Sequence, residues 1–234
     1  VDNTSDSLRG ATLYTSPSQE GIAQSNEPPP LAKDLTSYKG HVFYFNTTSK
    51  QRLTFTIIAV NNTGVSNLGY YSGVTVSSVS GSDIVVSSAT NVAKGQLVTA
   101  VSGITLPAGT TVTNVVGTTV TLSAAVSSGA SGSANFHDRV SIAGTDYYAS
   151  NANNVSSNYF KIPTTGTLSE NIEDAARNLI KVINESSSNT VVYAYYLSSI
   201  DDLPGKILIE ERSIGGKLLL WDFFQGCITK SRME

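Results

Sequence analysis

Two neighbouring stretches decide the fold class: His41-Val42-Phe43-Tyr44-Phe45 and Leu53-Thr54-Phe55-Thr56-Ile57. The first stretch is rich in aromatic and β-branched residues, which favour strands. The second alternates apolar and hydroxyl side chains, which is the pattern of a half-buried strand. A polar turn over residues 46–51 separates the two stretches. We therefore expect a scaffold hairpin over residues 41–60 and a mainly β protein.

Residues 61–136 form a block of different composition. Between Arg52 and His137 the only charged residues are Asp83 and Lys94. Short segments rich in Val, Thr and Ser recur between Gly or Pro-Ala-Gly breaks, at the spacing of a sandwich or small barrel. Because the flanking strands do not share this composition, we interpret the block as an inserted β-sandwich or barrel-like module. Its expected strands are residues 73–79, 83–87, 96–101, 110–116 and 118–123.

Residues 137–224 are expected to form a small α+β unit. Apolar residues that lie 3, 4, 7, 8 and 11 steps after Ile172 predict one amphipathic helix over about residues 169–185. Thr167 and Glu170 have the spacing of a capping box at its start. The apolar face of this helix would cover a sheet. The strands expected for that sheet are residues 190–197, 206–211 and 217–223. Before the helix, residues 139–142 and 145–148 are expected to form a second hairpin, which a segment at residues 159–162 follows.

The two ends of the sequence differ from these blocks. Residues 1–40 are expected to be an extended segment, because Pro28-Pro29-Pro30 favour a polyproline conformation. Residues 225–234 are expected to be a tail. The sequence begins at Val1 without an initiator Met, and its single Met is Met233. We therefore expect the chain to be a piece of a longer polypeptide.

The composition of the 234 residues narrows the function classes. Only 14% of them are charged, against roughly a quarter in an ordinary globular domain, and the net charge is −3. This balance gives no basic footprint for nucleic acid. No apolar run approaches the roughly 20 residues of a membrane-spanning helix. The single cysteine, Cys227, excludes an internal disulfide framework and a multi-cysteine metal site.

The sequence offers acidic pairs and histidines but no catalytic motif. Glu210 and Glu211 are neighbours on an expected strand, so their side chains point to opposite faces. Asp201-Asp202 precede Pro204-Gly205, in a turn where Asp bonds the backbone. Neither His41 nor His137 has a nucleophile motif beside it. We expect no catalytic, cofactor-binding or metal-binding residue, and no enzyme activity.

The aromatic residues of the α+β unit are the candidate contact residues. Tyrosines on a strand can stack on a sugar, although strand aromatics more often fill a sheet core or an interface. Both interpretations remain open at this stage. The candidates for an interface or a glycan contact are Tyr147, Tyr148, Tyr195, Tyr196 and Trp221.

Three parts of the chain resemble virion tail proteins of tailed bacteriophages. Residues 31–34 followed by 38–46 resemble a blade-opening strand of a propeller-like tail protein. Residues 95–123, with Gly-Ile-Thr-Leu-Pro-Ala-Gly at 103–109, are similar to small β modules of phage tail and fibre proteins. The third part resembles a domain inserted in short-tail tube or nozzle proteins, and comprises residues 171–176, 192–196 and 202–208. The resemblance brings no catalytic residues.

The resemblance implies a structural tail protein in a tube, nozzle or hub. Such a subunit would form a ring with other copies of itself, contact neighbouring tail proteins and let DNA pass without specific binding. It would be made in the host cytoplasm and located in the virion. One alternative is a fibre or adhesin module that binds host-surface glycan. A weaker alternative is a polysaccharide-degrading tail enzyme, which needs two carboxylates about 5 to 10 Å apart.

Overall fold

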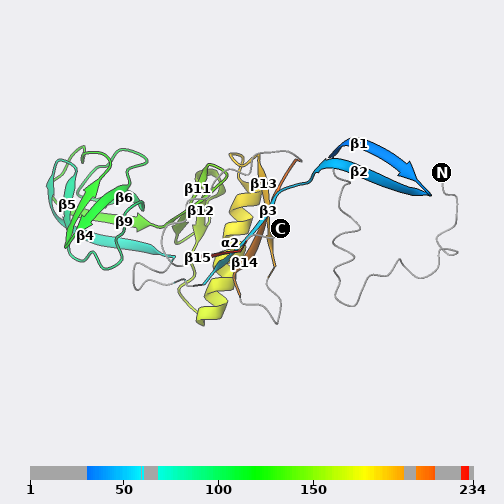
Figure 1. Ribbon diagram of the computed structural model, residues 1–234. Coiled ribbons are helices and arrows are strands. Elements are labelled where there is room, and N and C mark those ends of the chain that lie inside the picture. The colour runs from blue at the N-terminus through cyan, green and yellow to red at the C-terminus, as the bar shows by residue number, and fades with distance from the viewer. Residues whose placement is uncertain (1–30, 59, 61–67, 198–203, 214–227, 232–234) are drawn as a thin grey trace. The chain divides into compact units, whose positions relative to one another are not determined.

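The computed structural model describes residues 31–58, 60, 68–197, 204–213 and 228–231. The chain divides into two compact units between Ser49 and Lys50. The protein is mainly β, with several antiparallel sheets and, among the described residues, one α-helix (Figure 1). The expectation of a mainly β fold with a small α part is therefore confirmed.

The first unit contains one hairpin, formed by β1 (Leu31–Tyr38) and β2 (His41–Thr48). The expected hairpin over residues 41–60 is therefore wrong, because β2 pairs with β1 and not with residues 53–57. Lys39 and Gly40 form the turn with φ of +49° and +79°. Positive φ at both central residues is the type I′ geometry, which matches the twist of paired strands. The expected extended segment thus ends in a strand, and its residues 1–30 lie outside the described part.

The second unit contains a four-stranded antiparallel sheet in the order β13-β14-β3-β15. β3 (Arg52–Ile57) lies between β14 (Lys206–Glu211) and β15 (Ile228–Ser231), and β13 (Val192–Tyr196) pairs with β14. The strand expected at residues 217–223 lies outside the described residues. The expected tail, by contrast, supplies β15, because β3 offers it a second edge.

The single helix lies in this second unit and joins two sheets. α2 (Leu168–Glu185) begins after Thr167, whose side chain and that of Glu170 form the predicted capping box. It contacts strands of the four-stranded sheet and of a three-stranded sheet in the order β10-β11-β12 (Figure 1). The strands of that second sheet are β10 (Arg139–Ile142), β11 (Thr145–Ser150) and β12 (Tyr159–Lys161). The 3-10 helix η1 (Val155–Ser157) lies between β11 and β12 in the sequence.

One apolar core holds the helix and both of these sheets. The buried face of α2 contains five of the six residues that the helical period predicted, while Ile180 is only partly buried and Val182 is buried without having been predicted. It packs with residues from before and after the 61–136 block. The α+β unit therefore includes strand β3, which lies outside the expected bounds of residues 137–224. Members of this core include Phe55, Ile57, Val140, Tyr147, Phe160, Ile172, Leu179, Ile183, Ile207 and Ile209.

Residues 70–137 build a six-stranded sheet in the order β6-β9-β4-β5-β8-β7. Val98 N–H donates to Thr110 O (2.8 Å) and Val112 N–H to Gln96 O (2.9 Å), so the two edge strands meet and the sheet closes. The closed sheet has a core of its own, which includes Val76, Ile84, Val120 and Phe136. Its strands are β4 (Tyr70–Ser80), β5 (Asp83–Val86), β6 (Leu97–Ser102), β7 (Val112–Val116), β8 (Thr119–Leu122) and β9 (Gly132–His137), and β9 was not predicted.

Candidate functional site

The β1–β2 hairpin has two apolar faces. Its register places Tyr38, Phe43 and Phe45 on one face, since residues directly opposite each other share a face and neighbours alternate. The other face carries Leu35, Val42 and Tyr44. Each of these six side chains is between 44% and 63% exposed. We call this set of six residues the hairpin patch.

The hairpin patch is unusual for a two-stranded sheet. An isolated hairpin is marginally stable in water and needs further strands or a packed face for independent stability. Sequence patterns of free antiparallel sheets keep one face polar, whereas both faces here carry large apolar groups. Large exposed apolar surfaces mark interaction sites. The hairpin patch is therefore the strongest candidate for an assembly contact among the described residues.

The outer edge of β13 is closed by two asparagine side chains. Asn189 accepts a hydrogen bond from Val192 N–H (3.2 Å) and donates one to Val192 O (2.9 Å). Asn184 does the same to Ala194, with both distances 2.8 Å. A side-chain amide used in this way occupies the backbone groups that a further strand would need. β13 therefore does not offer these groups for pairing with another chain.

The candidate tyrosines of β11 do not form an exposed contact. Tyr147 is fully buried in the core, which corrects its assignment to an interface or glycan contact. Burial raises the pKa of Tyr147 to about 12, and its hydroxyl finds no partner among the described atoms. Tyr148 is half-buried beside Asp146, which is paired with Arg139 at 3.1 Å. Neighbouring side chains on a strand point to opposite faces, so only one of the two tyrosines points into the core, and this is Tyr147.

The candidate tyrosines of β13 lie on different faces of the other sheet. Tyr195 is exposed, and its ring centroid lies 6.4 Å from that of Tyr193. Arg212 lies over the Tyr193 ring at 4.3 Å. Tyr196 is half-buried beneath Arg177 of α2, 4.4 Å from its ring centroid. The four candidate tyrosines therefore do not form one stacking surface. Trp221 and Cys227 lie outside the described residues.

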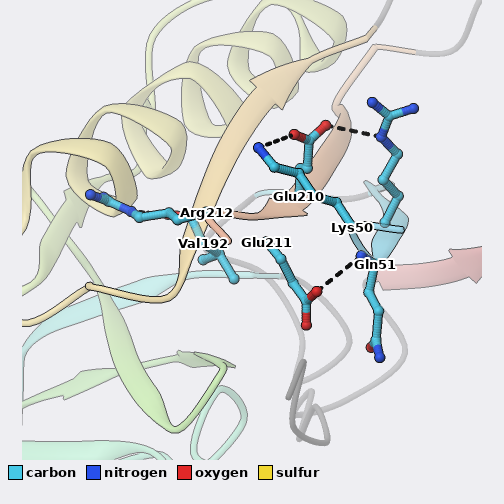
Figure 2. A network of polar contacts seen from close by, with 7 residues as sticks. Lys50, Gln51, Val192, Glu210, Glu211 and Arg212 are labelled. Atoms are coloured by element: carbon cyan, nitrogen blue, oxygen red, sulfur yellow. Dashed lines mark hydrogen bonds and ion pairs between the residues drawn. The ribbon is translucent and has the colours of Figure 1, made fainter. Parts of the chain in front are cut away.

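The adjacent acids of β14 have separate structural partners (Figure 2). Glu210 forms ion pairs with Lys50 (3.2 Å) and Arg52 (2.9 Å). Glu211 is fully buried, and one of its carboxylate oxygens accepts a hydrogen bond from the Gln51 N–H at 3.0 Å. The two carboxylates therefore do not share a site, as the alternation of strand side chains predicts. Asp201-Asp202 lie outside the described residues.

A buried polar network joins the closed sheet to the α+β unit. Asp138 accepts hydrogen bonds from the Gly69 N–H at 2.6 Å and from the Gln96 amide at 2.9 Å. Burial raises the pKa of Asp138 to about 6, although both hydrogen bonds act to lower it. Gly69 and Asp138 stand where the chain enters and leaves the closed sheet. We call this pair of crossings the junction.

His137 belongs to the same junction. Its Nδ1 lies 2.8 Å from the Ala149 carbonyl, which can only accept, so Nδ1 carries the proton. Nε2 of the neutral ring then accepts from the Thr99 hydroxyl at 2.9 Å. Burial lowers the pKa of His137 and so favours this neutral ring. Because both ring nitrogens and both Asp138 oxygens bond other groups, His137 and Asp138 form no catalytic pair here.

The sequence reasoning did not identify Asn184, Asn189 or Gln96. Asn184 begins an Asn-Glu-Ser sequon, yet both ends of its side-chain amide are engaged by Ala194. The only feature of the sequence that could have identified the role of Asn189 is its position as a turn-forming Asn directly before an expected apolar strand. In the described part of the chain, no three His, Cys, Asp or Glu side chains gather to hold a metal. None of its helices is long and apolar enough to cross a membrane.

Comparisons with known proteins add no relative. No protein-family model, curated protein or solved structure matches the chain.

Proposed function

We propose that this chain is a structural protein of a bacteriophage tail, a tube, nozzle or hub component that acts by assembling into a ring. The observation that carries the proposal is the hairpin patch, because a protein that exposes two apolar faces on one hairpin is built to be covered by neighbours. The kind of assembly comes from the resemblance to tail proteins, which is carried by residues 31–34, 38–46, 95–123, 171–176, 192–196 and 202–208.

The closed edges of β13 and of the six-stranded sheet support different roles for the two units. Asn184 and Asn189 occupy the outer backbone groups of β13, and the six-stranded sheet joins its own edge strands. Closure of an edge suppresses uncontrolled pairing between chains. Assembly contacts are then concentrated in the hairpin, while the low-charge closed sheet is a rigid body that does not aggregate through its edges.

The charge of the chain suits a passage for DNA. With a net charge of −3, the chain has no excess of cationic over anionic side chains that could retain the phosphates of passing DNA. Neither face of the hairpin is suited to line a water-filled channel, because both faces carry large apolar groups. The hairpin patch is therefore placed between neighbouring subunits, and other surfaces of the subunit face the passing DNA.

The position of the chain in an assembled particle tests this function. Purified virions of the phage that encodes it would be imaged by cryo-electron microscopy, with the chain located by a gold-labelled tag. We expect a ring of copies on the tail axis. Localisation at fibre tips, or absence of the chain from purified virions, would refute the proposal.

A further inference from the structure

A cavity of about 330 Å³ opens beside the junction, between the start of β4 and the chain that follows β11 and β12. Pockets of this size are at the lower end of those that hold small ligands, and they form preferentially where two structural units meet. The described residues that line it are Tyr70, Ser72, Asn151, Lys161, Ile162 and Thr164.

The walls of the cavity are rich in donors. Tyr70, Ser72 and Thr164 contribute hydroxyls, and Lys161 contributes the only charge among the lining residues, without any acid. No hydrogen bond or ion pair engages the Lys161 ammonium group within the described part of the chain. Such a lining matches a ligand with several oxygen acceptors and one negative charge.

The backbone that carries these side chains is held in place. Lys161 N–H donates to the Asn153 side chain at 2.7 Å, and Lys161 O accepts from Asn178 at 3.1 Å. The Tyr70 ring lies 4.8 Å from the His137 ring, which the junction fixes. The backbone at Lys161 and the Tyr70 ring are thus held in place, and this reduces the ordering cost of binding, while the Lys161 side chain is exposed to solvent.

We infer that this cavity binds a single carboxylated sugar unit, with Lys161 at the carboxylate and the hydroxyl side chains at the ring hydroxyls. The volume accommodates one hexose-sized ring. The half-buried Tyr70 offers an aromatic surface for the apolar side of that ring. This binding site goes beyond the assembly function and does not depend on it.

Isothermal titration calorimetry of the full chain with galacturonate, galactose and acetate tests the inference. We expect galacturonate to bind more tightly than galactose, and acetate to give no measurable binding. Lys161→Gln should weaken galacturonate binding roughly fivefold, the scale of an exposed ion pair, and leave galactose unchanged. Tyr70→Phe keeps the ring and should weaken both sugars.

Lys94→Gln is the matched control, because Lys94 is an exposed lysine of the closed sheet outside the cavity. It should leave all three affinities unchanged. The inference is wrong if galacturonate does not bind, if acetate binds as tightly as galacturonate, or if Lys161→Gln and Lys94→Gln have the same effect.

Discussion

Asp138 shows how one side chain fixes the junction. Its carboxylate bonds the Gly69 N–H and the Gln96 amide, so a single group ties both chain crossings to the loop before β6. The charged form loses hydration on burial, and this cost exceeds the gain from the two hydrogen bonds, which raises the pKa to about 6.

This pKa predicts how stability depends on pH. The pKa of Asp138 is about 6 in the folded chain against an ordinary 3.8, so the native state binds the proton more tightly. The stabilisation is fully present below pH 3.8 and is lost as pH rises through about 6. Asp138→Asn removes it. The destabilisation by this variant, relative to the parent chain, should grow by about 1 kcal/mol between about pH 7.5 and pH 5.

Urea unfolding at both pH values measures this difference. His137 acts in the opposite direction: its lowered pKa gives stability that is lost as pH falls below the ordinary 6.5. His137 is common to the variant and the parent chain, so its effect cancels in the comparison. An equal effect of Asp138→Asn at both pH values would contradict the account.

At the residue scale, the sequence predicted which side chains point to opposite faces of a strand better than it predicted which of those faces is buried. The alternation of β14 correctly separated Glu210 from Glu211, whereas Tyr147 and Tyr148 were grouped as contact residues although they are neighbours on β11. It did not say which face would be covered, because that depends on α2 and on strands distant in the sequence. The polar residues of the junction were missed for the same reason, since Gln96 and Asp138 meet only after the six-stranded sheet closes.

At the element scale, β13 depends on its amide-capped edge. Asn189→Ala removes both hydrogen bonds with Val192. It also removes the one that the side chain donates to Ile183 O and the one that it accepts from the Val191 N–H. Because Asn189 is buried, the backbone groups that it leaves cannot all be hydrated. We expect thermal unfolding to show a loss of roughly 2 kcal/mol.

Asn114→Ala is the matched control, because Asn114 is exposed on β7. It should change stability by less than about 0.5 kcal/mol. If both variants have the same small effect, the side-chain amide of Asn189 does not secure the strand.

The closed sheet depends on glycines where its strands approach closely. A Cβ on Gly132 would lie 2.0 Å from the Ser102 carbonyl oxygen and 2.9 Å from the Gly103 Cα. Backbone atoms cannot move aside as a flexible side chain can. Gly132→Ala should therefore lower the unfolding free energy by more than about 2 kcal/mol.

Gly117→Ala supplies the comparison in a chemical denaturation experiment. Gly117 has φ of +60° with no atom within 4 Å of its missing Cβ, so only backbone strain of about 1 kcal/mol is expected. An equal or greater loss in Gly117→Ala would show that the close approach at Gly132 is not what limits the sheet.

Elements with local signals were predictable, and pairings were not. The helical period and capping box placed α2 within one residue, and the strand at 206–211 was also found. β9 was missed because Gly132, Ser133 and Ala134 are small and carry no apolar alternation. The pairing of residues 41–45 with 53–57 was wrong because the Lys39–Gly40 turn closes a tighter hairpin with preceding residues.

At the scale of the whole molecule, the second unit has two cores. One core surrounds α2 and the other fills the six-stranded sheet. Each is apolar and enclosed, so this unit has the means to fold without a partner. Among the described residues of the first unit, the hairpin has no such core, and its large apolar side chains are exposed. This contrast is why we propose that the assembly contact lies in residues 31–48.

Sedimentation velocity of the full chain tests this central claim most directly. The parent chain is compared with the double variant Phe43→Ser, Phe45→Ser, which removes two aromatic groups from one face of the hairpin. The control is Val101→Ser, Val116→Ser, which removes two exposed apolar groups from the closed sheet. Circular dichroism establishes that all three chains keep the fold of the second unit.

We expect the parent chain and the control to sediment as oligomers and the hairpin variant to sediment as a single chain at the same concentration. Loss of the buried aromatic surface should weaken association by at least a hundredfold, since each removed group contributes on the order of 2 kcal/mol. A parent chain that stays monomeric at every concentration, or a hairpin variant that associates as strongly as the parent, would contradict the account.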